Sequence, residues 1–195
     1  MRFLLTALVC LPLMAAGPLS NRRAPGFTLP DMNVNYHDLY DYRGKIVLLD
    51  ILQTACPVCN SSQRIFETIR QKFPDKVVIL SVVTQPDTQD TVKWFVTQNN
   101  VKTPVLFDCG QAIASYLKAT PKNPQISLPH LFLIDAKGWI RNDWEYKSGN
   151  EKYFESLDPV LEEVTALVNE MGGGGAAKAP PAAPKAAPAK PAPKK

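Results

Sequence analysis

The chain has 195 residues, of which 45% are hydrophobic and 21% charged, so most of it can bury the core of one ordinary domain with appendages at its ends. Its four cysteines are too few for a scaffold that depends on disulfides. Six of the 22 basic residues lie in the two terminal segments, whereas all 18 acidic residues lie between them. The central region is therefore slightly acidic, so the composition does not indicate a basic nucleic-acid-binding surface on the fold, and we expect no nucleic-acid partner.

The N-terminal segment has the pattern of an export signal. One basic residue, Arg2, precedes an apolar stretch over residues 3–14, and small residues follow it. This stretch is too short to span a bilayer comfortably, so we expect a signal peptide over residues 1–16. An uncleaved membrane anchor is the alternative. Either way, we expect an exported, periplasmic or otherwise extracytoplasmic protein, in which residues 17–23 form a linker.

From residue 24 onward, strand-like and helix-like patterns alternate. The apolar run KIVLLDIL is typical of a strand buried on both faces, and PVCNSSQRIFETIRQKF repeats apolar residues with helical spacing. Asp87 is expected to cap a second helix. The predicted strands cover residues 45–52, 76–84, 103–107, 130–135 and 139–146, and the predicted helices cover residues 57–73, 87–100, 110–119 and 151–171. This order predicts an α/β domain over residues 24–171, in which the last two strands are antiparallel.

The C-terminal segment, residues 172–195, is rich in Ala, Pro and Lys and has no aromatic or branched aliphatic residue. It cannot bury enough apolar surface to offset the entropy of ordering, so we expect a disordered tail. Its five lysines have two interpretations. The tail is a solubilising linker, or it is weakly attracted to an anionic envelope surface.

The motif CPVC places Cys56 and Cys59 where the first long strand meets a helix. A zinc site needs about four ligands, and the remaining candidates, Cys109, His37 and His130, are scattered singly. A purely structural disulfide would close a loop of only a few residues and constrain the unfolded chain little. A redox role has positive support. The helix N-terminus stabilises a thiolate at Cys56, and Cys59, one turn later, can resolve a mixed disulfide.

These motifs resemble a known family. KIVLLDILQTACPVC followed by a helix, together with SLPHLFLIDAKGWI, is similar to the thioredoxin fold of exported TlpA/ResA-like thiol–disulfide oxidoreductases, which are related to the AhpC/TSA group. The resemblance covers about residues 24–171. It implies a thioredoxin-like fold with a central mixed β-sheet flanked by helices, no metal or organic cofactor, and protein substrates with thiols or disulfides. It also implies an upstream redox partner, for which a membrane-bound electron donor is one candidate.

The resemblance assigns a role to several residues. Cys56 takes the place of the attacking thiol and Cys59 that of the resolving thiol, so that the two form the redox-active disulfide. Pro129 takes the place of the cis-proline that faces the dithiol and pairs with the backbone of an incoming peptide. Leu128 and His130, on either side of it, belong to the same substrate-binding segment. The sequence does not reveal whether the Pro129 bond is cis or trans.

Asp50 interrupts the first long apolar strand six positions before Cys56. In thioredoxins an aspartate at this spacing is buried behind the dithiol and exchanges a proton with the resolving cysteine. Desolvation is expected to raise its pKa, as that role requires. The alternative is an acid near the end of the sheet that reaches water.

Several positions depart from the family's pattern. The residue before the first cysteine is usually Trp, and here it is Ala55, with Gln53 and Thr54 in place of bulkier residues. The loss of a hydrophobic flank leaves substrate choice and redox potential open. His130 has two interpretations: it approaches Cys56 and favours the thiolate when protonated, or it is bonded to backbone at the start of a strand.

Cys109, in FDCGQ, is expected to be a small apolar residue in a turn before a short helix, although a third exported thiol that becomes oxidised or pairs with another chain is the alternative. The tryptophans Trp94, Trp139 and Trp144 have no spacing that indicates a site.

Two classes of function compete for the CPVC motif. The first is thiol–disulfide exchange with protein thiols. The second is a peroxiredoxin-like thiol peroxidase, in which Cys56 is the peroxidatic cysteine and Cys59 condenses with its sulfenic acid. Peroxiredoxins usually carry Thr three residues before that cysteine, where this chain has Gln53. A redox-inert binding module is disfavoured because both thiols are present. The direction of electron flow depends on tens of millivolts and is not predicted.

Overall fold

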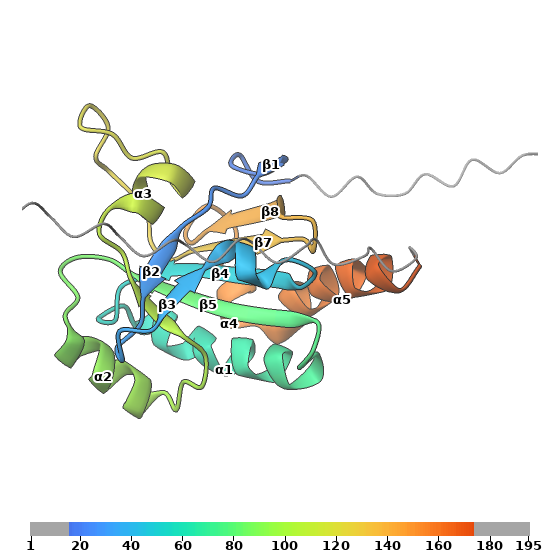
Figure 1. The fold of residues 1–195 in the computed structure, drawn as a ribbon, viewed down its shortest axis with the longest axis horizontal. Coiled ribbons are helices and arrows are strands. Elements are labelled where there is room, and N and C mark those ends of the chain that lie inside the picture. Colours follow the sequence, from blue (N-terminus) through green and yellow to red (C-terminus); the bar gives the residue numbers. More distant parts are fainter. Residues whose placement is uncertain (1–15, 174–195) are drawn as a thin grey trace, which may run out of the picture.

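The computed structural model describes residues 16–173, and its centre is a six-stranded sheet (Figure 1). The strands are Arg22–Arg23 (β1), Ile46–Leu52 (β4), Val77–Val83 (β5), Val105–Phe107 (β6), His130–Ile134 (β7) and Trp139–Glu145 (β8). They lie in the order β1-β8-β7-β4-β5-β6. β4, β5 and β6 are parallel, whereas the other neighbouring pairs are antiparallel. The predicted mixed sheet of an α/β protein is confirmed.

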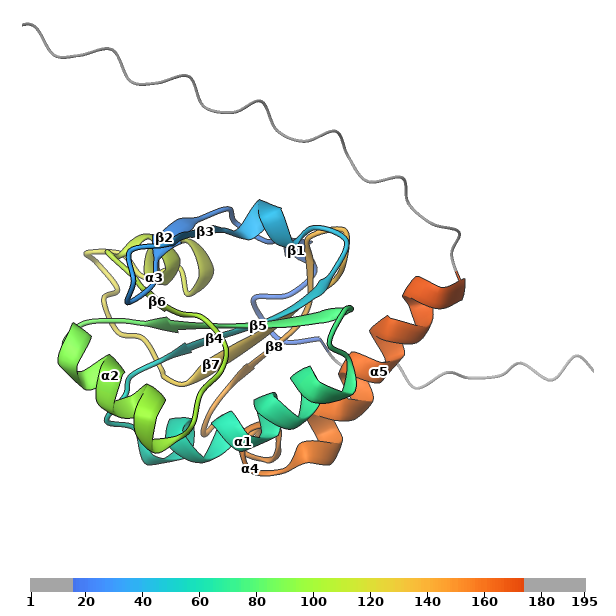
Figure 2. The ribbon, with the colours of Figure 1, turned by 60° about the horizontal axis from the view of Figure 1, so that its bottom comes forward.

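Further elements cover both faces of this sheet (Figure 2). One face carries four helices: Pro57–Lys72 (α1), Gln89–Gln98 (α2), Lys152–Glu155 (α4) and Leu157–Gly173 (α5). The other face carries Gln111–Tyr116 (α3), the 3-10 helix Leu39–Tyr42 (η1), and the antiparallel pair Thr28–Pro30 (β2) and Tyr36–Asp38 (β3). The sheet is therefore buried on both sides, which explains why its central strands are apolar.

The strand that leads to the cysteines is buried along its whole length. Leu49 and Ile51 of β4 pack on the side of α3, while Ile46 and Leu48 pack on the side of α1 and α5. Each of these fully buried side chains stabilises the fold by about 1.5–3 kcal/mol relative to exposure. The end of β4, and with it the loop that carries CPVC, is therefore fixed by packing on two layers.

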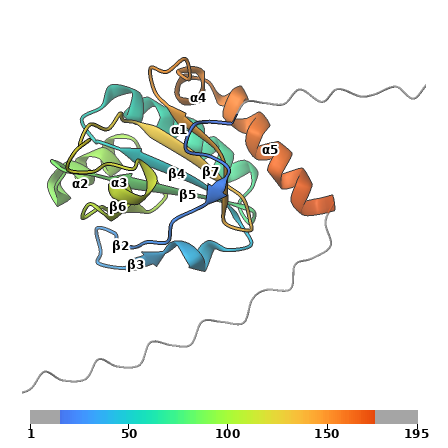
Figure 3. The same cartoon turned by 90° about the horizontal axis from the view of Figure 1, so that it is seen from above.

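The prediction of a single helix over residues 151–171 is wrong, because the structure has two helices there. α4 ends before Ser156, whose backbone is extended, and α5 begins at Leu157 (Figure 3). A continuous helix would need the backbone of Pro159 to donate a hydrogen bond to Glu155, and proline has no N–H. At its actual position, in the first turn of α5, Pro159 leaves no intrahelical bond unmade.

The linker expected over residues 17–23 is instead part of the folded domain. Arg22 and Arg23 form β1 and pair with β8. Further back, the Gly17 N–H donates to Asn142 Oδ1 at 2.9 Å, and the Leu19 N–H donates to Asp143 Oδ1 at 2.9 Å. These partners lie more than 120 residues away in the sequence. The expected signal peptide, apart from Ala16, and the expected tail beyond Gly173 lie outside the described residues.

Within residues 16–173, no helix combines the length and the apolar character that crossing a membrane requires. The same part of the chain has no group of three or more His, Cys, Asp or Glu side chains that could hold a metal ion.

Candidate active site

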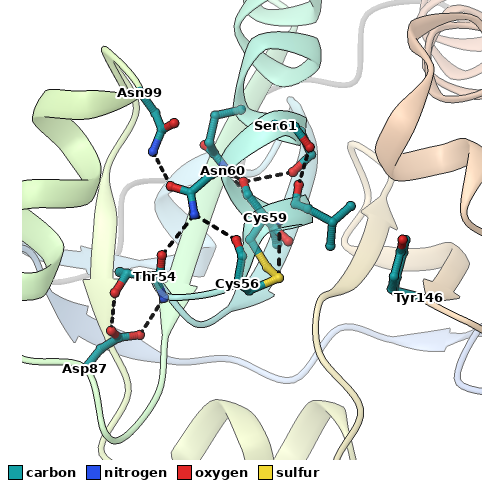
Figure 4. Close-up of a disulfide and its surroundings, with 12 residues drawn as sticks. Thr54, Cys56, Cys59, Asn60, Ser61, Asp87, Asn99 and Tyr146 are labelled. Carbon is teal, nitrogen blue, oxygen red and sulfur yellow. Dashed lines mark hydrogen bonds between the residues drawn. A yellow bond between two sulfur atoms is a disulfide. The ribbon is translucent and has the colours of Figure 1, made fainter.

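The CPVC motif lies where β4 ends and α1 begins, and its cysteines form a disulfide (Figure 4). Cys56 is the N-cap of α1, with Pro57 at the first helical position, and Cys59 lies in the first turn. Their Cα atoms are 5.3 Å apart, and the Cys59 N–H donates to Cys56 Sγ at 3.3 Å. Cys59 is completely buried, whereas Cys56 is partly exposed. The geometry gives Cys56 both access to solvent and the favourable end of the helix dipole.

A network of side-chain hydrogen bonds holds the loop before Cys56 (Figure 4). Asn60 Nδ2 donates to the carbonyl oxygens of Thr54, at 3.0 Å, and Cys56, at 2.7 Å. Asp87 accepts from both the backbone and the hydroxyl of Thr54. Asn99, after the end of α2, donates to the Asn60 amide oxygen. The CPVC loop is therefore tied to both ends of α2.

Sequence reasoning missed this network, because a helix cap was the only role that it gave to Asp87. That expectation is wrong. Thr88 is the N-cap of α2 and forms a capping box with Thr91, while the Asp87 carboxylate also accepts from the Thr91 hydroxyl at 2.9 Å. Asp87 thereby joins the CPVC loop to the first turn of α2. A polar side chain immediately after the second cysteine, Asn60, was the only local feature of the sequence that could have indicated this network.

Asp50 lies in β4 and is completely buried, so the alternative in which it reaches water is wrong. Its Oδ2 accepts a hydrogen bond from Gln63 Nε2 at 3.3 Å, and the same nitrogen lies 3.3 Å from the Cys59 carbonyl oxygen. Its Oδ1 has no hydrogen-bond partner. Burial raises the pKa of Asp50 to about 7, and the Gln63 hydrogen bond lowers it by a smaller amount. The structure therefore places beneath the helix turn of Cys59 a carboxyl whose pKa is raised by burial.

The peptide bond between Leu128 and Pro129 is cis. Pro129 is buried and immediately precedes β7, whose first residue, His130, pairs with Ile51 near the end of β4. The loop of Leu128 and Pro129 therefore lies at the same edge of the sheet as the CPVC loop. A second cis peptide bond, between Gln85 and Pro86 after β5, was not expected from the sequence.

His130 is buried at the start of β7. Its Nε2 lies 3.0 Å from Asp143 Oδ2, both side chains are almost completely buried, and its ring stacks on Phe132 with 4.5 Å between the centroids. The partner is thus a carboxylate rather than backbone. Burial alone raises the pKa of Asp143, but hydrogen bonds from His130, Ser20 and the backbone of Leu19 outweigh it and hold this pKa below its usual value.

An apolar depression of about 460 Å³ adjoins the CPVC loop and is lined by Thr54, Ala55, Asp90, Thr91 and Trp94. Trp94 of α2 is 56% exposed. An aromatic surface thus lies beside Ala55, at the flank where the family's tryptophan is missing from the sequence. Trp94, for which the sequence indicated no site, belongs to the surroundings of the CPVC loop.

Cys109 is exposed and lies in the bend immediately before α3, where the sequence predicted a turn. The neighbouring Asp108 caps α3 by accepting hydrogen bonds from the backbone of Ala112 and Ile113.

These features define a class of protein: a thioredoxin-like fold with a redox disulfide at the start of the first long helix and a cis-proline at the same edge of the sheet. Residues 21–143 match the model of the AhpC/TSA family, and the chain belongs to this family. The thiol-disulfide oxidoreductase ResA of Bacillus anthracis is 32% identical over 144 residues, which are 74% of this chain and 78% of that protein. The thiol-disulfide oxidoreductase ResA of Bacillus thuringiensis subsp. konkukian is 28% identical over 144 residues, which are again 74% of this chain and 78% of that protein.

Solved structures agree on the fold. A thiol:disulfide interchange protein of the thioredoxin family from Chlorobium tepidum has a TM-score of 0.60 and 15% identity, with 73% of this chain and 95% of that chain covered. The predicted thioredoxin-like fold is therefore confirmed. The predicted class of enzyme, a thiol–disulfide oxidoreductase, is confirmed by the ResA relatives and by the Cys56–Cys59 disulfide.

Proposed function

We propose that this protein exchanges disulfides with protein thiols outside the cytoplasm, through Cys56 and Cys59. The observation that carries the proposal is the disulfide between a partly exposed cysteine at a helix N-terminus and a completely buried cysteine one turn later. Such a pair gives one thiol access to a partner and keeps the other for an intramolecular step.

In the reducing direction, the Cys56 thiolate attacks one sulfur of a substrate disulfide. A bond forms between Cys56 and that sulfur, and the other substrate sulfur leaves as a thiolate that takes a proton from solvent. Cys59 then attacks Cys56 Sγ, the Cys56–Cys59 disulfide forms, and the second substrate sulfur leaves. The substrate gains two electrons and the dithiol loses two. An upstream thiol donor must then restore the dithiol, and running the steps backwards oxidises a substrate instead.

Asp50 is the proposed general base of the second step. Cys59 is buried and must lose its proton before it attacks, and Asp50 lies beneath the same helix turn, linked to it through Gln63. A pKa of about 7 lets this carboxyl accept a proton near neutral pH and release it afterwards. Burial supports the role, because the completely buried Cys59 thiol has no direct access to bulk solvent as a proton acceptor.

Substrate binding is proposed for the loop of Leu128 and Pro129 and for the depression beside Ala55. Both adjoin the end of β4 at which Cys56 lies. The backbone that flanks a substrate cysteine would pair with the loop, and its side chains would lie against Trp94. His130 contributes indirectly, because its side chain is engaged by Asp143.

The peroxidase alternative is not favoured. Gln53, which stands where peroxiredoxins usually have Thr, donates its amide N–H to the Gln85 carbonyl at 2.8 Å. It is therefore tied to the loop after β5. The ResA relatives are named thiol-disulfide oxidoreductases.

The proposed location rests on the sequence of residues 1–16, which predicts export. A membrane-held electron donor as upstream partner, and weak attraction of the lysine-rich tail to the envelope, belong to the same proposal. Flotation of the tail with anionic vesicles at low and physiological salt tests whether the tail is attracted to an anionic membrane surface.

The exchange activity is tested with the whole chain and a protein disulfide such as insulin, with dithiothreitol as donor. We expect catalysis by the wild type and none by Cys56→Ser. Cys59→Ser is expected to trap a mixed disulfide through Cys56, while Cys56→Ser traps none. Faster turnover of hydrogen peroxide than of the protein disulfide would favour the peroxidase, and an adduct on Cys59 would reverse the assignment of the attacking thiol. Equilibration with glutathione buffers gives the redox potential and the direction of electron flow.

A further inference from the structure

Among residues 16–173, two side-chain polar atoms are buried without a hydrogen-bond partner: Asp50 Oδ1 and Ser81 Oγ. Both residues are completely buried. They occupy directly paired positions on the neighbouring parallel strands β4 and β5. An unsatisfied buried polar group costs about 1–3 kcal/mol, so two such groups at adjacent positions call for an explanation.

The two side chains point to the same layer of the fold. Asp50 contacts Gln63 of α1, and Ser81 lies between Ile79 and Val83, which pack on the side of α1 and α2. Neighbouring strands lie about 4.8 Å apart, so a rotation about the side-chain bonds brings a serine hydroxyl and a carboxyl at paired positions within hydrogen-bonding distance.

The other groups around Asp50 offer no alternative partner for Oδ1. On the opposite side, β7 places Leu131 next to it, and α1 places Cys59 and Gln63 above it. Of these, Cys59 is the one titratable group, and it carries no proton while the disulfide is closed. Gln63 already donates to Oδ2. Ser62 of α1 also has a buried hydroxyl, but it donates to the Cys59 carbonyl oxygen at 3.1 Å. Ser81 is thus the buried hydroxyl without a partner on the strands and helix that face Asp50.

We propose that Ser81 is a positioning residue for the resolving step, in which its hydroxyl hydrogen-bonds to Asp50 Oδ1. This inference rests on the proposed function, in which Asp50 takes the proton of Cys59. While Asp50 is ionised, the Ser81 O–H donates to Oδ1 and the Gln63 N–H donates to Oδ2. When the proton moves from Cys59 Sγ to Oδ1, the new O–H donates to Ser81 Oγ, whose own proton turns away.

A hydroxyl suits this position because it both donates and accepts, whereas the Gln63 N–H can only donate. Because the Gln63 N–H donates to Oδ2, Oδ2 is the unprotonated carbonyl oxygen of the neutral carboxyl, and the proton binds to Oδ1. Ser81 stabilises the charged carboxylate more than the neutral acid, because hydrogen bonds to ions are the stronger ones. Its removal is expected to raise the pKa of Asp50 further.

The decisive variants are Ser81→Thr and Ser81→Val, which have nearly the same shape and differ in the hydroxyl. The measurement is the ¹³Cγ chemical shift of Asp50 against pH in the whole chain, in the oxidised and reduced states, with Asp50→Asn to assign the signal. We expect the apparent pKa of Asp50 in Ser81→Thr to stay near that of the wild type. In Ser81→Val it is expected to rise by about one to two units. Equal values in the two variants overturn the inference.

Kinetics supply a second readout. Below the raised pKa, the resolving step of Ser81→Val should be slower than that of Ser81→Thr by about tenfold, and the difference should vanish once both carboxyls are ionised at higher pH. In an Asp50→Asn background the two variants should resolve equally. A difference that persists there would make Ser81 a packing residue. The titration requires no turnover, so it tests Ser81 even if the protein proves inactive towards protein disulfides.

Discussion

Asp50 on β4 and His130 on β7 lie one register position apart, since Asp50 pairs with Leu131 and Ile51 pairs with His130, yet they face opposite sides of the sheet. Asp50 contacts Gln63 of α1, and His130 contacts Asp143 on the side of α3. Side chains alternate along a strand, so this separation is fixed by the register. The two groups therefore have separate roles, and the predictions below treat them separately.

His130→Asn is expected to lower stability without slowing the reaction of Cys56. The substitution removes a hydrogen bond to a buried carboxylate, which costs about 1.5–3 kcal/mol. Urea unfolding measures the loss, and alkylation of reduced Cys56 by iodoacetamide measures thiolate reactivity. Asp143→Asn is the matched control. The double variant should lose less free energy of unfolding than the sum of the losses in the two single variants, because the two residues are hydrogen-bond partners. A fall in the alkylation rate with His130→Asn alone would give His130 an electrostatic role at the thiol.

Asp50→Asn is expected to slow resolution of the mixed disulfide by about 10²–10⁴-fold, the range for a lost general base, and to leave the first attack almost unchanged. The first attack depends on the helix N-terminus instead. Stopped-flow traces separate the phases, and Cys59→Ser marks the first. In the wild type, resolution should accelerate as the pH rises through about 7, where Asp50 ionises. Equal slowing of both phases, or of neither, would remove Asp50 from the mechanism.

The stability of the oxidised protein is expected to fall as the pH rises from about 4 to 7. Burial raises the pKa of Asp50 to about 7 from an ordinary 3.8, so between these values the folded state holds a proton that the unfolded state has lost. The favourable contribution is complete below the unfolded pKa and lost above the folded one. The free energy of unfolding of Asp50→Asn should therefore exceed that of the wild type by up to about 4 kcal/mol at pH 8, and the two values should converge near pH 4. Urea unfolding measures both, with the exposed Asp90→Asn as control. Parallel curves for Asp50→Asn and wild type would contradict the raised pKa.

Trp94→Ala is expected to raise the KM for a peptide or protein disulfide by about 5–30-fold, as for the loss of one aromatic contact, and to leave kcat nearly unchanged. Reduction of a small disulfide, which does not reach the depression beside Ala55, should be unaffected. Trp139, 45% exposed on β8, provides the matched control because Trp139→Ala also removes an exposed indole. The same KM change in both variants would argue against a specific surface at Trp94.

A chain that begins at Ala24 is expected to be less stable than one that begins at Gly17, by about 3–5 kcal/mol. The shorter chain lacks β1 and the hydrogen bonds from Leu19 and Ser20 to Asp143, of which those to the charged carboxylate contribute most. Urea unfolding of the two chains measures the difference. Indistinguishable midpoints would show that residues 17–23 add nothing to the fold.

Much of the architecture was determined locally by the sequence. An apolar run buried on both faces, a Cys-Pro at a helix start and the alternation of strand and helix patterns depend only on neighbouring residues, so they predicted β4, α1 and the order of elements. The run alone left the burial of Asp50 open, and the resemblance to thioredoxins predicted it; the structure decided it, because both faces of the sheet are covered. The site cysteines were therefore recognisable before any fold was known.

The tertiary structure alone decided which side chains meet. His130 finds its partner on β8, Gly17 and Leu19 bond to residues 142 and 143, and Ser81 stands beside Asp50 through the register of two strands. Trp94 likewise reaches the flank of Ala55 only because α2 is tied to the CPVC loop. Periodicity tells which face of an element is buried but not which residue of another element lies opposite it. That pairing depends on register, rotamer and chain path, which are set by packing of the whole domain.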